Sequence, residues 1–408
     1  MISQFHSIAQ VADILGVSKE TLRRWDKNGK LVALRHPDNN YRVYDVSQLE
    51  RFEQFQMLFN SSWDKELKTE PKRPFNLIEL FAGAGGLAIS LEKAGFHSLL
   101  LNDYDKDCCK TLRRNRDWHV IHDDVKNINF KEYKGKVDLL SGGFPCQAFS
   151  YAGKKLGFDD IRGTLFFDFA RAIKETNPKV ILGENVRGLL NHDLGRTLEV
   201  MRGVIDDLGY DLVEPRVLKA VFYKVPQKRE RLFLIGIRKD LKAKEKFAFP
   251  SPYHKIMTVK DALKKGELYS TNVRKSEGSE YPQRKKEILS LIPQGGYWRD
   301  LPDKVQREYM GGSYFLGGGK TGMARRLSWD EPSLTLTCAP AQKQTERCHP
   351  SETRPLTVRE YARIQTFPDN WKFEGSISSR YKQIGNAVPI NLGHALGRSL
   401  VRLLNQIP

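Results

Sequence analysis

The strongest constraint on the fold is a regular alternation of short apolar runs and amphipathic segments over residues 75–240. Short apolar runs are typical of buried strands, and apolar residues spaced three and four apart are typical of helices that cover a sheet. Strands alternating with helices predict an α/β fold with a mostly parallel, doubly wound sheet. The expected strands are residues 77–81, 98–101, 137–140, 180–182 and 232–237, and the expected helices are 87–94, 166–176 and 198–208.

Residues 1–60 follow a different pattern, that of two short helices and a strand. The second helix carries Arg23 and Arg24 on its polar face. Two helices joined by a glycine-containing turn indicate a helix-turn-helix, and a following strand would form its wing. The expected elements are a helix over residues 8–15, a turn at Gly16, a helix over 19–28 capped by Ser18, and a strand over 41–44.

The chain is strongly basic, with 67 Lys and Arg against 49 Asp and Glu and a net charge of +18. Residues 238–354 carry 23 basic and 14 acidic side chains, so half of the surplus lies in this stretch. Such a surplus favours a polyanionic partner, although a solvated lysine-rich surface is the alternative.

Several protein classes are disfavoured. The longest clean apolar run, about residues 232–237, is far shorter than the ~18 residues of a membrane-spanning helix. The N-terminus lacks the pattern of an export signal, so we expect no membrane association and a cytoplasmic location. Five cysteines without a Cys-x-x-Cys pair predict neither a disulfide scaffold nor a metal site.

A glycine-rich turn follows the first expected strand. Gly83 and Gly85 let the backbone approach a ligand at a helix N-terminus. The spacing is Gly-x-Gly-Gly, which disfavours a nicotinamide dinucleotide. Asp103 ends the second strand, where a carboxylate can hold ribose hydroxyls, and Tyr104 beside it could stack on an adenine. Asp124 after a third strand completes a frame that favours a nucleoside cofactor, although each feature alone is also common in ordinary loops.

Cys146 follows another strand, in a loop opened by Gly142 and Gly143. A thiolate in such a loop can serve as a nucleophile if nearby donors or cations favour it. An inert thiol is the alternative for any single cysteine.

Several short sequence motifs, which follow one another in a fixed order, carry a specific resemblance to a known family. Over about residues 75–403 the chain resembles the DNA cytosine-C5 methyltransferases, and chance agreement of so many ordered blocks is negligible. Residues 1–60 resemble the winged helix-turn-helix of MerR-type regulators and excisionases, through residues 21–25 and 41–42. Glu79 departs from the aspartate that is frequent at this position of the methyltransferases. The blocks of the methyltransferase resemblance are residues 81–86, 144–147, 162–166, 184–186, 227–231, 359–365 and 385–389.

The resemblance implies a reaction and its residues. Cys146 would add to C6 of cytosine, Glu184 would hold the N3 and amino edge of the base, and Arg229 and Arg231 would face the active site. S-adenosyl-L-methionine would be the cofactor. Its pocket would be formed by Phe81, Gly83, Gly85, Asp103, Tyr104, Asp124, Val125, Leu165 and Asn386.

The resemblance also implies how DNA is engaged. The target cytosine must leave the duplex, and residues 147–165 resemble the loop that closes over the flipped base. The basic stretch 241–354 stands where the family has its target-recognition region. The expected DNA contacts are Ser150 and Arg162 in the loop, Arg325, Arg326 and Lys343 in the recognition region, with Gln342, Gln344 and Arg347 as further candidates, and Arg23 and Arg24 in the N-terminal domain.

Taken together, the sequence predicts a sequence-specific DNA cytosine-5 methyltransferase, the modification enzyme of a restriction-modification system, whose functional partner would be a restriction endonuclease. A second hypothesis, which can coexist with the first, is a DNA-binding regulator whose N-terminal domain represses transcription of its own operon; that domain could instead aid substrate binding. A tRNA cytosine methyltransferase is the third hypothesis. The target sequence and the oligomeric state stay open. The expected division is a helix-turn-helix domain at 1–60, a linker at 61–74, a catalytic domain at 75–240, a target-recognition domain at 241–354 and a returning C-terminal segment at 355–408.

Overall fold

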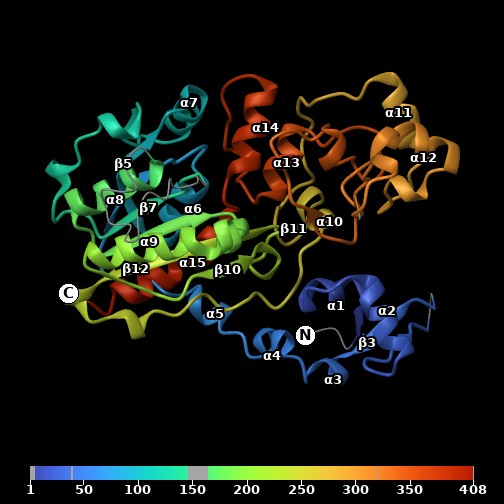
Figure 1. The fold of residues 1–408 in the computed structure, drawn as a ribbon, viewed down its shortest axis with the longest axis horizontal. Helices are drawn as coiled ribbons and strands as arrows, with labels where there is room; N and C mark the ends of the chain where they lie inside the picture. Colours follow the sequence, from blue (N-terminus) through green and yellow to red (C-terminus); the bar gives the residue numbers. More distant parts are fainter. Residues whose placement is uncertain (1–4, 38–39, 146–163, 319, 408) are drawn as a thin grey trace.

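The computed structural model describes residues 5–37, 40–145, 164–318 and 320–407. Its centre is an eight-stranded sheet in the order β10-β12-β8-β7-β4-β5-β6, with β9 paired to β12 (Figure 1). The strands are β4 (Phe75–Leu80), β5 (Phe96–Asp103), β6 (Val120–His122), β7 (Leu139–Gly142), β8 (Val180–Asn185), β9 (Tyr210–Leu212), β10 (Arg216–Lys219) and β12 (Glu230–Arg238).

Strand direction in this sheet confirms the predicted fold class. The five strands β6, β5, β4, β7 and β8 run parallel to one another. β12 runs antiparallel to β8, β9 and β10, a reversal that the apolar pattern of residues 232–237 did not reveal. The parallel strands therefore deliver the segments after them to a single edge of the sheet, where ligands of such folds bind.

Helices cover both faces of the sheet. The helices α6 (Gly86–Ala94) and α15 (Ile390–Leu404) share one buried cluster with the sheet, and α8 (Leu165–Thr176) and α9 (Arg196–Asp207) share the other. α7 (Lys106–Asn115) lies between β5 and β6 in the chain. Because α15 packs on α6, the C-terminal segment returns to the first strand-helix unit, as the sequence predicted.

The predicted recognition region forms a separate lobe (orange in Figure 1) with its own buried cluster. It contains α11 (Gln283–Ser290) and α12 (Asp303–Met310), whereas α10 (Val259–Leu263) of the same region packs on α13; none of these three helices was predicted. Two short strands, β11 (Gln227–Lys228) and β13 (Ser333–Leu334), pair in parallel and tie the lobe to the catalytic domain. α13 (Val358–Ile364) and α14 (Ile377–Asn386) lie between lobe and sheet.

The N-terminal domain has the predicted helix-turn-helix and wing. Ser18 Oγ accepts a hydrogen bond from the Thr21 amide and caps the second helix, and Gly16 ends the first with φ of 69°. A three-stranded sheet in the order β1-β3-β2 supports the helices. The elements are β1 (Phe5–Ser7), α1 (Ile8–Leu15), α2 (Lys19–Lys27), β2 (Leu34–Arg35), β3 (Arg42–Asp45), α3 (Val46–Leu49), α4 (Glu53–Phe59) and α5 (Trp63–Glu66).

The segment interpreted as a polar linker, residues 61–74, is packed against the catalytic domain. Trp63 in α5 belongs to the main buried cluster. Glu66 accepts hydrogen bonds from the amide and hydroxyl of Ser251. Arg73 forms an ion pair with the buried Asp138 at 2.6 Å. Polar composition concealed this docking, because the polar side chains themselves make the contacts.

Candidate active site

The glycine-rich turn between β4 and α6 forms one wall of the site. Phe81 adopts φ of 57° and Gly85 adopts φ of 86°, both in the left-handed region. That conformation costs a side-chain-bearing residue energy and is concentrated at functional sites. Asp103 braces the turn, because its carboxylate accepts hydrogen bonds from the amides of Gly83 at 2.7 Å and Asp105 at 2.8 Å.

A cavity of about 430 Å³ lies against this turn. Its lining includes the acidic side chains Glu79, Asp103, Asp105 and Glu184 and the cations Arg231 and Lys382, so acidic groups outnumber basic ones. Glu79 is 2% exposed, and its Oε2 atom has no hydrogen-bond partner among the described residues. Burial raises the pKa of Glu79 well above its usual value.

The same cavity holds an ion pair between Glu184 and Arg231. Glu184 lies near the end of β8, and Arg231 lies near the start of the antiparallel β12, so the strand pairing brings them together. Arg231 Nε lies 2.6 Å from Glu184 Oε1, and each side chain is only 12% exposed. Burial raises the pKa of Glu184, and the charges of Arg231 and Arg229 oppose that rise. A carboxyl group in this balance can share a proton with a bound base.

The loop that leads to Cys146 is fixed beside this pair. Asn185 Nδ2 donates to the Phe144 carbonyl at 2.9 Å. A Cβ atom on Gly143 would lie 2.9 Å from Glu184 Oε2, so only glycine lets the loop pass this close to the carboxylate. Pro145 lines the cavity and directly precedes Cys146, which lies outside the described residues.

Arg229 has a different environment from Arg231. Its guanidinium is buried and donates to the carbonyls of Leu336 at 3.2 Å and Asn386 at 3.3 Å. Burial and the neighbouring Arg231 lower the pKa of Arg229. Arg229 therefore joins the segment after β13 and the end of α14 to the catalytic site.

The structure brings some of the predicted cofactor residues together. Phe81, Gly83, Asp103 and Asn386 line the 430 Å³ cavity with Glu184 and Arg231. The other predicted residues lie around the turn or at the same edge of the sheet without lining it: Gly85 at the start of α6, the exposed Tyr104, Asp124 and Val125 after β6, and Leu165 at the start of α8. Cys146, Ser150 and Arg162 lie outside the described residues, and their roles stay predictions.

The prediction that Arg326 contacts DNA is wrong. Arg326 is 5% exposed and donates five hydrogen bonds within the protein, four to carbonyls and one to the Thr353 hydroxyl. A guanidinium has five N–H donors in all, so none is left for a base. Arg347 is also buried and donates to the carbonyls of Thr335 and Glu346.

The other predicted DNA contacts are more accessible. Lys343 is exposed, and Arg325 is partly buried, with a hydrogen bond to the Gly295 carbonyl at 2.8 Å. Arg23 and Arg24 are exposed on α2. Nothing in these positions assigns a base or a phosphate to any of the four, so their DNA contacts stay predictions.

Sequence reasoning assigned no role to several residues of this site. Asn185 stands inside the recognised block 184–186, and Gly143, named only as a residue that opens the Cys146 loop, directly precedes the block 144–147, so both positions were an available signal. Glu79 was noted only as a departure from the family pattern. Cys338 was given no role, and its thiol donates to Oδ1 of Asn386, a residue that lines the cavity, at 3.1 Å. Only the folded chain brings residue 338 to residue 386.

Comparison with known proteins decides the family. Residues 75–402 match the family model described as C-5 cytosine-specific DNA methylase. This chain belongs to that family. It is a DNA cytosine-5 methyltransferase, and residues 7–44 additionally match the MerR family of regulatory proteins.

Two curated relatives are similar in sequence over nearly the whole chain. The methyltransferase is 66% identical to the type II methyltransferase M.Eco47II of Escherichia coli, over 100% of this chain and 98% of the relative. It is 62% identical to the type II methyltransferase M.PspPI of a Psychrobacter strain, over 98% of this chain and 97% of the relative.

Solved structures have a similar fold. A candidate DNA modification methyltransferase encoded in an E. coli prophage is 26% identical, with a TM-score of 0.57, over 81% of this chain and 99% of the other. Dnmt2 of S. pombe is 17% identical, with a TM-score of 0.53, over 82% and 100% of the two chains, and this likeness concerns the fold alone.

Neither a metal-binding cluster nor a membrane-spanning helix is present among the described residues. No group of three or more His, Cys, Asp or Glu side chains among them could hold a metal ion. In the same part of the chain, no helix has the length and apolar character needed to cross a membrane.

Proposed function

We propose that this methyltransferase methylates C5 of a cytosine flipped out of duplex DNA, through a covalent bond between Cys146 Sγ and C6 of the base. The observation that carries the proposal is the Glu184–Arg231 pair, which shares one cavity with the glycine-rich turn and with Pro145, the residue before Cys146. A nucleophile, a proton-sharing carboxyl group and a cofactor cavity at one edge of the sheet are the parts that this reaction needs.

The residues of the cavity fit S-adenosyl-L-methionine, which carries a positive sulfonium. Four acidic side chains line the cavity, namely Glu79, Asp103, Asp105 and Glu184, and Glu79 Oε2 has no hydrogen-bond partner among the described residues. Asp103 and the backbone of the glycine-rich turn would hold the nucleoside part, and Phe81 and Asn386 would complete the enclosure. When bound, the cofactor supplies an electrophilic methyl group.

The chain's own residues would make C5 reactive. The Cys146 thiolate forms a bond to C6, and the C5–C6 double-bond electrons make C5 nucleophilic. Glu184 holds the N3 and amino edge and shares a proton with N3, while Arg231 fixes the Glu184 carboxylate and faces the base. C5 takes the methyl group and then loses its proton to water or hydroxide. The electron pair re-forms the C5–C6 bond and expels the Cys146 thiolate.

The cytosine would reach this cavity only outside the duplex, since C5 and C6 are stacked inside it. The enzyme would act in the cytoplasm as the modification partner of a restriction endonuclease with the same target sequence.

The experiment is single-base mapping of 5-methylcytosine in DNA from a methylation-free bacterial host that expresses the chain. We expect methylation at one short motif with the wild-type protein and none with Cys146→Ala. Methylation by the Cys146→Ala variant would remove Cys146 from the nucleophile role. No methylation by soluble wild-type protein would contradict the DNA substrate, and tRNA would be tested next.

A second candidate function, transcriptional autoregulation, is favoured by the MerR match and by the exposure of Arg23 and Arg24 on α2. The test is a gel-shift titration with the gene's own upstream DNA. Arg23→Ala/Arg24→Ala would lose specific binding to that DNA but keep methylation of the mapped motif. Equal binding of upstream and unrelated DNA by the wild-type protein would contradict this function.

A further inference from the structure

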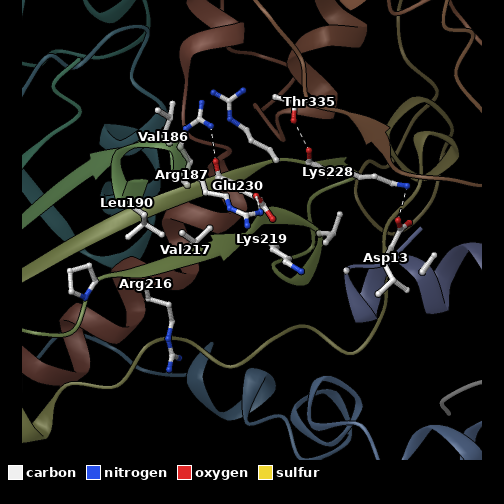
Figure 2. Close-up of a pocket in the computed structure, with 18 residues that line it drawn as sticks. Asp13, Val186, Arg187, Leu190, Arg216, Val217, Lys219, Lys228, Glu230 and Thr335 are labelled. Carbon is white, nitrogen blue, oxygen red and sulfur yellow. Dashed lines mark hydrogen bonds and ion pairs between the residues drawn. The ribbon is translucent and has the colours of Figure 1, made fainter. Parts of the chain in front are cut away.

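A second and larger cavity, of about 970 Å³, lies between the N-terminal domain and the catalytic domain (Figure 2). One wall is the end of α1 and the turn after it, and the others are the segment after β8, the strand β10 and the start of β12. Val186 and Arg231 line both this cavity and the catalytic cavity, so the two adjoin at these side chains.

The charge of this second cavity is strongly unbalanced. Its lining holds two carboxylates, Asp13 and Glu230, and six cationic side chains: Arg187, Arg216, Lys219, Lys228, Arg229 and Arg231. Clefts lined by one sign of charge concentrate ligands of the opposite sign. The ligand that this lining favours is therefore an extended anion.

The N-terminal domain holds two of the lysines in place. Figure 2 shows Lys228 reaching Asp13 on α1, with Nζ 2.6 Å from Asp13 Oδ1. Lys219 extends between β10 and the same helix, and a Cβ atom on Gly16 would lie 2.5 Å from Lys219 Nζ. The Lys219 ammonium thus sits at the C-terminal end of α1, where the helix dipole favours a cation.

The domain is docked firmly enough to act as a wall. Val221 and Ile256 of the catalytic and recognition parts belong to the same buried cluster as Val11 and Leu22 of the N-terminal domain. Lys19, at the start of α2, also forms an ion pair with Glu331. α1 faces the body of the enzyme, whereas Arg23 and Arg24 of α2 stay exposed.

We propose that this cavity binds the sugar-phosphate backbone of the substrate DNA next to the flipped cytosine, with the N-terminal domain as its outer wall. The N-terminal domain is then part of the substrate site of the methyltransferase. The inference rests on the proposed route of the cytosine to Glu184, because the backbone of a base held there must pass Val186 and Arg231.

Two cations of the lining are placed to meet phosphates. Within the part of the chain that the structure describes, no carboxylate lies within ion-pair distance of Lys219. Arg187 pairs with Glu230, and the Arg187 side chain is 65% exposed. Exposed ion pairs are weak, so a phosphate can replace Glu230 at little cost.

The first test measures the salt dependence of binding to a short labelled duplex of mixed sequence. Each lost phosphate contact reduces the slope of log K against log salt by about 0.9. We expect Arg187→Gln/Lys219→Gln to reduce the slope by roughly 2 and to weaken binding about tenfold at physiological salt. Lys131→Gln/Lys134→Gln removes the same charge from exposed positions outside both the cavity and the recognition region and should leave both values near wild type.

The second test addresses the wall itself. Val17 lines the cavity from the N-terminal domain. Val17→Glu places a negative charge there and should weaken duplex binding several-fold, increasingly so at low salt, whereas Val17→Gln should bind like wild type. Cofactor binding and the melting temperature of both variants show that they are folded.

The inference is overturned if the duplex affinity is unchanged in both variants, Arg187→Gln/Lys219→Gln and Val17→Glu. If these variants bind tRNA more weakly than the wild type but bind the duplex equally well, the assignment of the cavity to DNA is overturned. The readout is equilibrium binding, so a chain that binds DNA through this cavity but fails to methylate would contradict the proposed reaction and not the cavity.

Discussion

At the scale of single residues, Glu184 and Arg231 hold each other in a nearly buried ion pair. Glu184→Gln keeps the shape but cannot accept or share the proton of N3. We expect kcat to fall by about 10²–10⁴, the usual contribution of a proton-sharing group. Single-turnover methylation of the mapped motif is the measurement. Glu214→Gln, at an exposed carboxylate, is the control, and an equal loss in both variants would refute the assigned role.

Glu79 makes the protein's stability depend on pH. The pKa of Glu79 is raised in the folded state. The folded protein is therefore most stable while Glu79 is protonated, and its free energy of unfolding falls as the pH rises through that raised pKa. Glu79→Gln removes this loss. The free energy of unfolding of the variant should exceed that of the wild type increasingly with pH, by up to about 1.4 kcal/mol for each pH unit across the titration.

The measurement is urea unfolding without cofactor between pH 5 and pH 9, compared in parallel for the two proteins. A difference that stays constant across this range would show that Glu79 does not titrate within it.

The identity of a residue predicted its chemical role better than it predicted whether its side chain is exposed. Glu184 and Arg231 could be proposed from the sequence because the resemblance assigns their roles. Arg326 could not be judged in the same way, since an arginine in a basic stretch looks the same whether its donors meet DNA or carbonyls. Its hydrogen bonds go to the Leu289 and Ile292 carbonyls at the end of α11, a helix that was itself not predicted.

At the scale of elements, the contact between α6 and α15 places the start of α6 beside the cofactor cavity. A Cβ atom on Gly397 would lie 2.7 Å from Ala94 Cβ, whereas nothing lies within 4 Å of one on Gly203 in α9. Gly397→Ala should lower the free energy of unfolding by about 1–3 kcal/mol through overpacking. Gly203→Ala should raise it by about 0.4–1 kcal/mol. Thermal and urea unfolding of both variants would reveal the difference, and equal signs would contradict this packing.

Helices and strands with a continuous apolar face could be predicted from the sequence, and short polar ones could not. The strands and helices that were predicted in the catalytic domain have continuous apolar faces, and their positions agree with the structure to within a few residues, whereas α7, β9 and β10 were not predicted. α11 and α12 are short and largely polar, and they are stabilised by contacts within the lobe, including the Arg326 hydrogen bonds. The direction of β12 depends on its partners, which no local pattern specifies.

At the scale of the whole molecule, the N-terminal domain and the enzyme body share a buried cluster. Ile256→Ala should cost about 2–5 kcal/mol and expose part of that cluster. We therefore expect faster hydrogen exchange in residues 8–27, which are distant from position 256 in the chain. Ile288→Ala, in the cluster of the recognition lobe, should accelerate exchange only there. Unchanged exchange in residues 8–27 of Ile256→Ala would mean that the domain is not docked in solution.

The proposed reaction depends on a covalent bond between Cys146 Sγ and C6 of cytosine. The most direct test is a duplex with 5-fluorocytosine at the mapped position, because fluorine cannot leave C5 as a proton does and the adduct cannot collapse. With S-adenosyl-L-methionine, the wild-type protein should form a denaturant-stable adduct that peptide mass spectrometry locates at Cys146, and Cys146→Ala should form none. Turnover of the normal duplex without any adduct, or an adduct at another residue, would contradict the account.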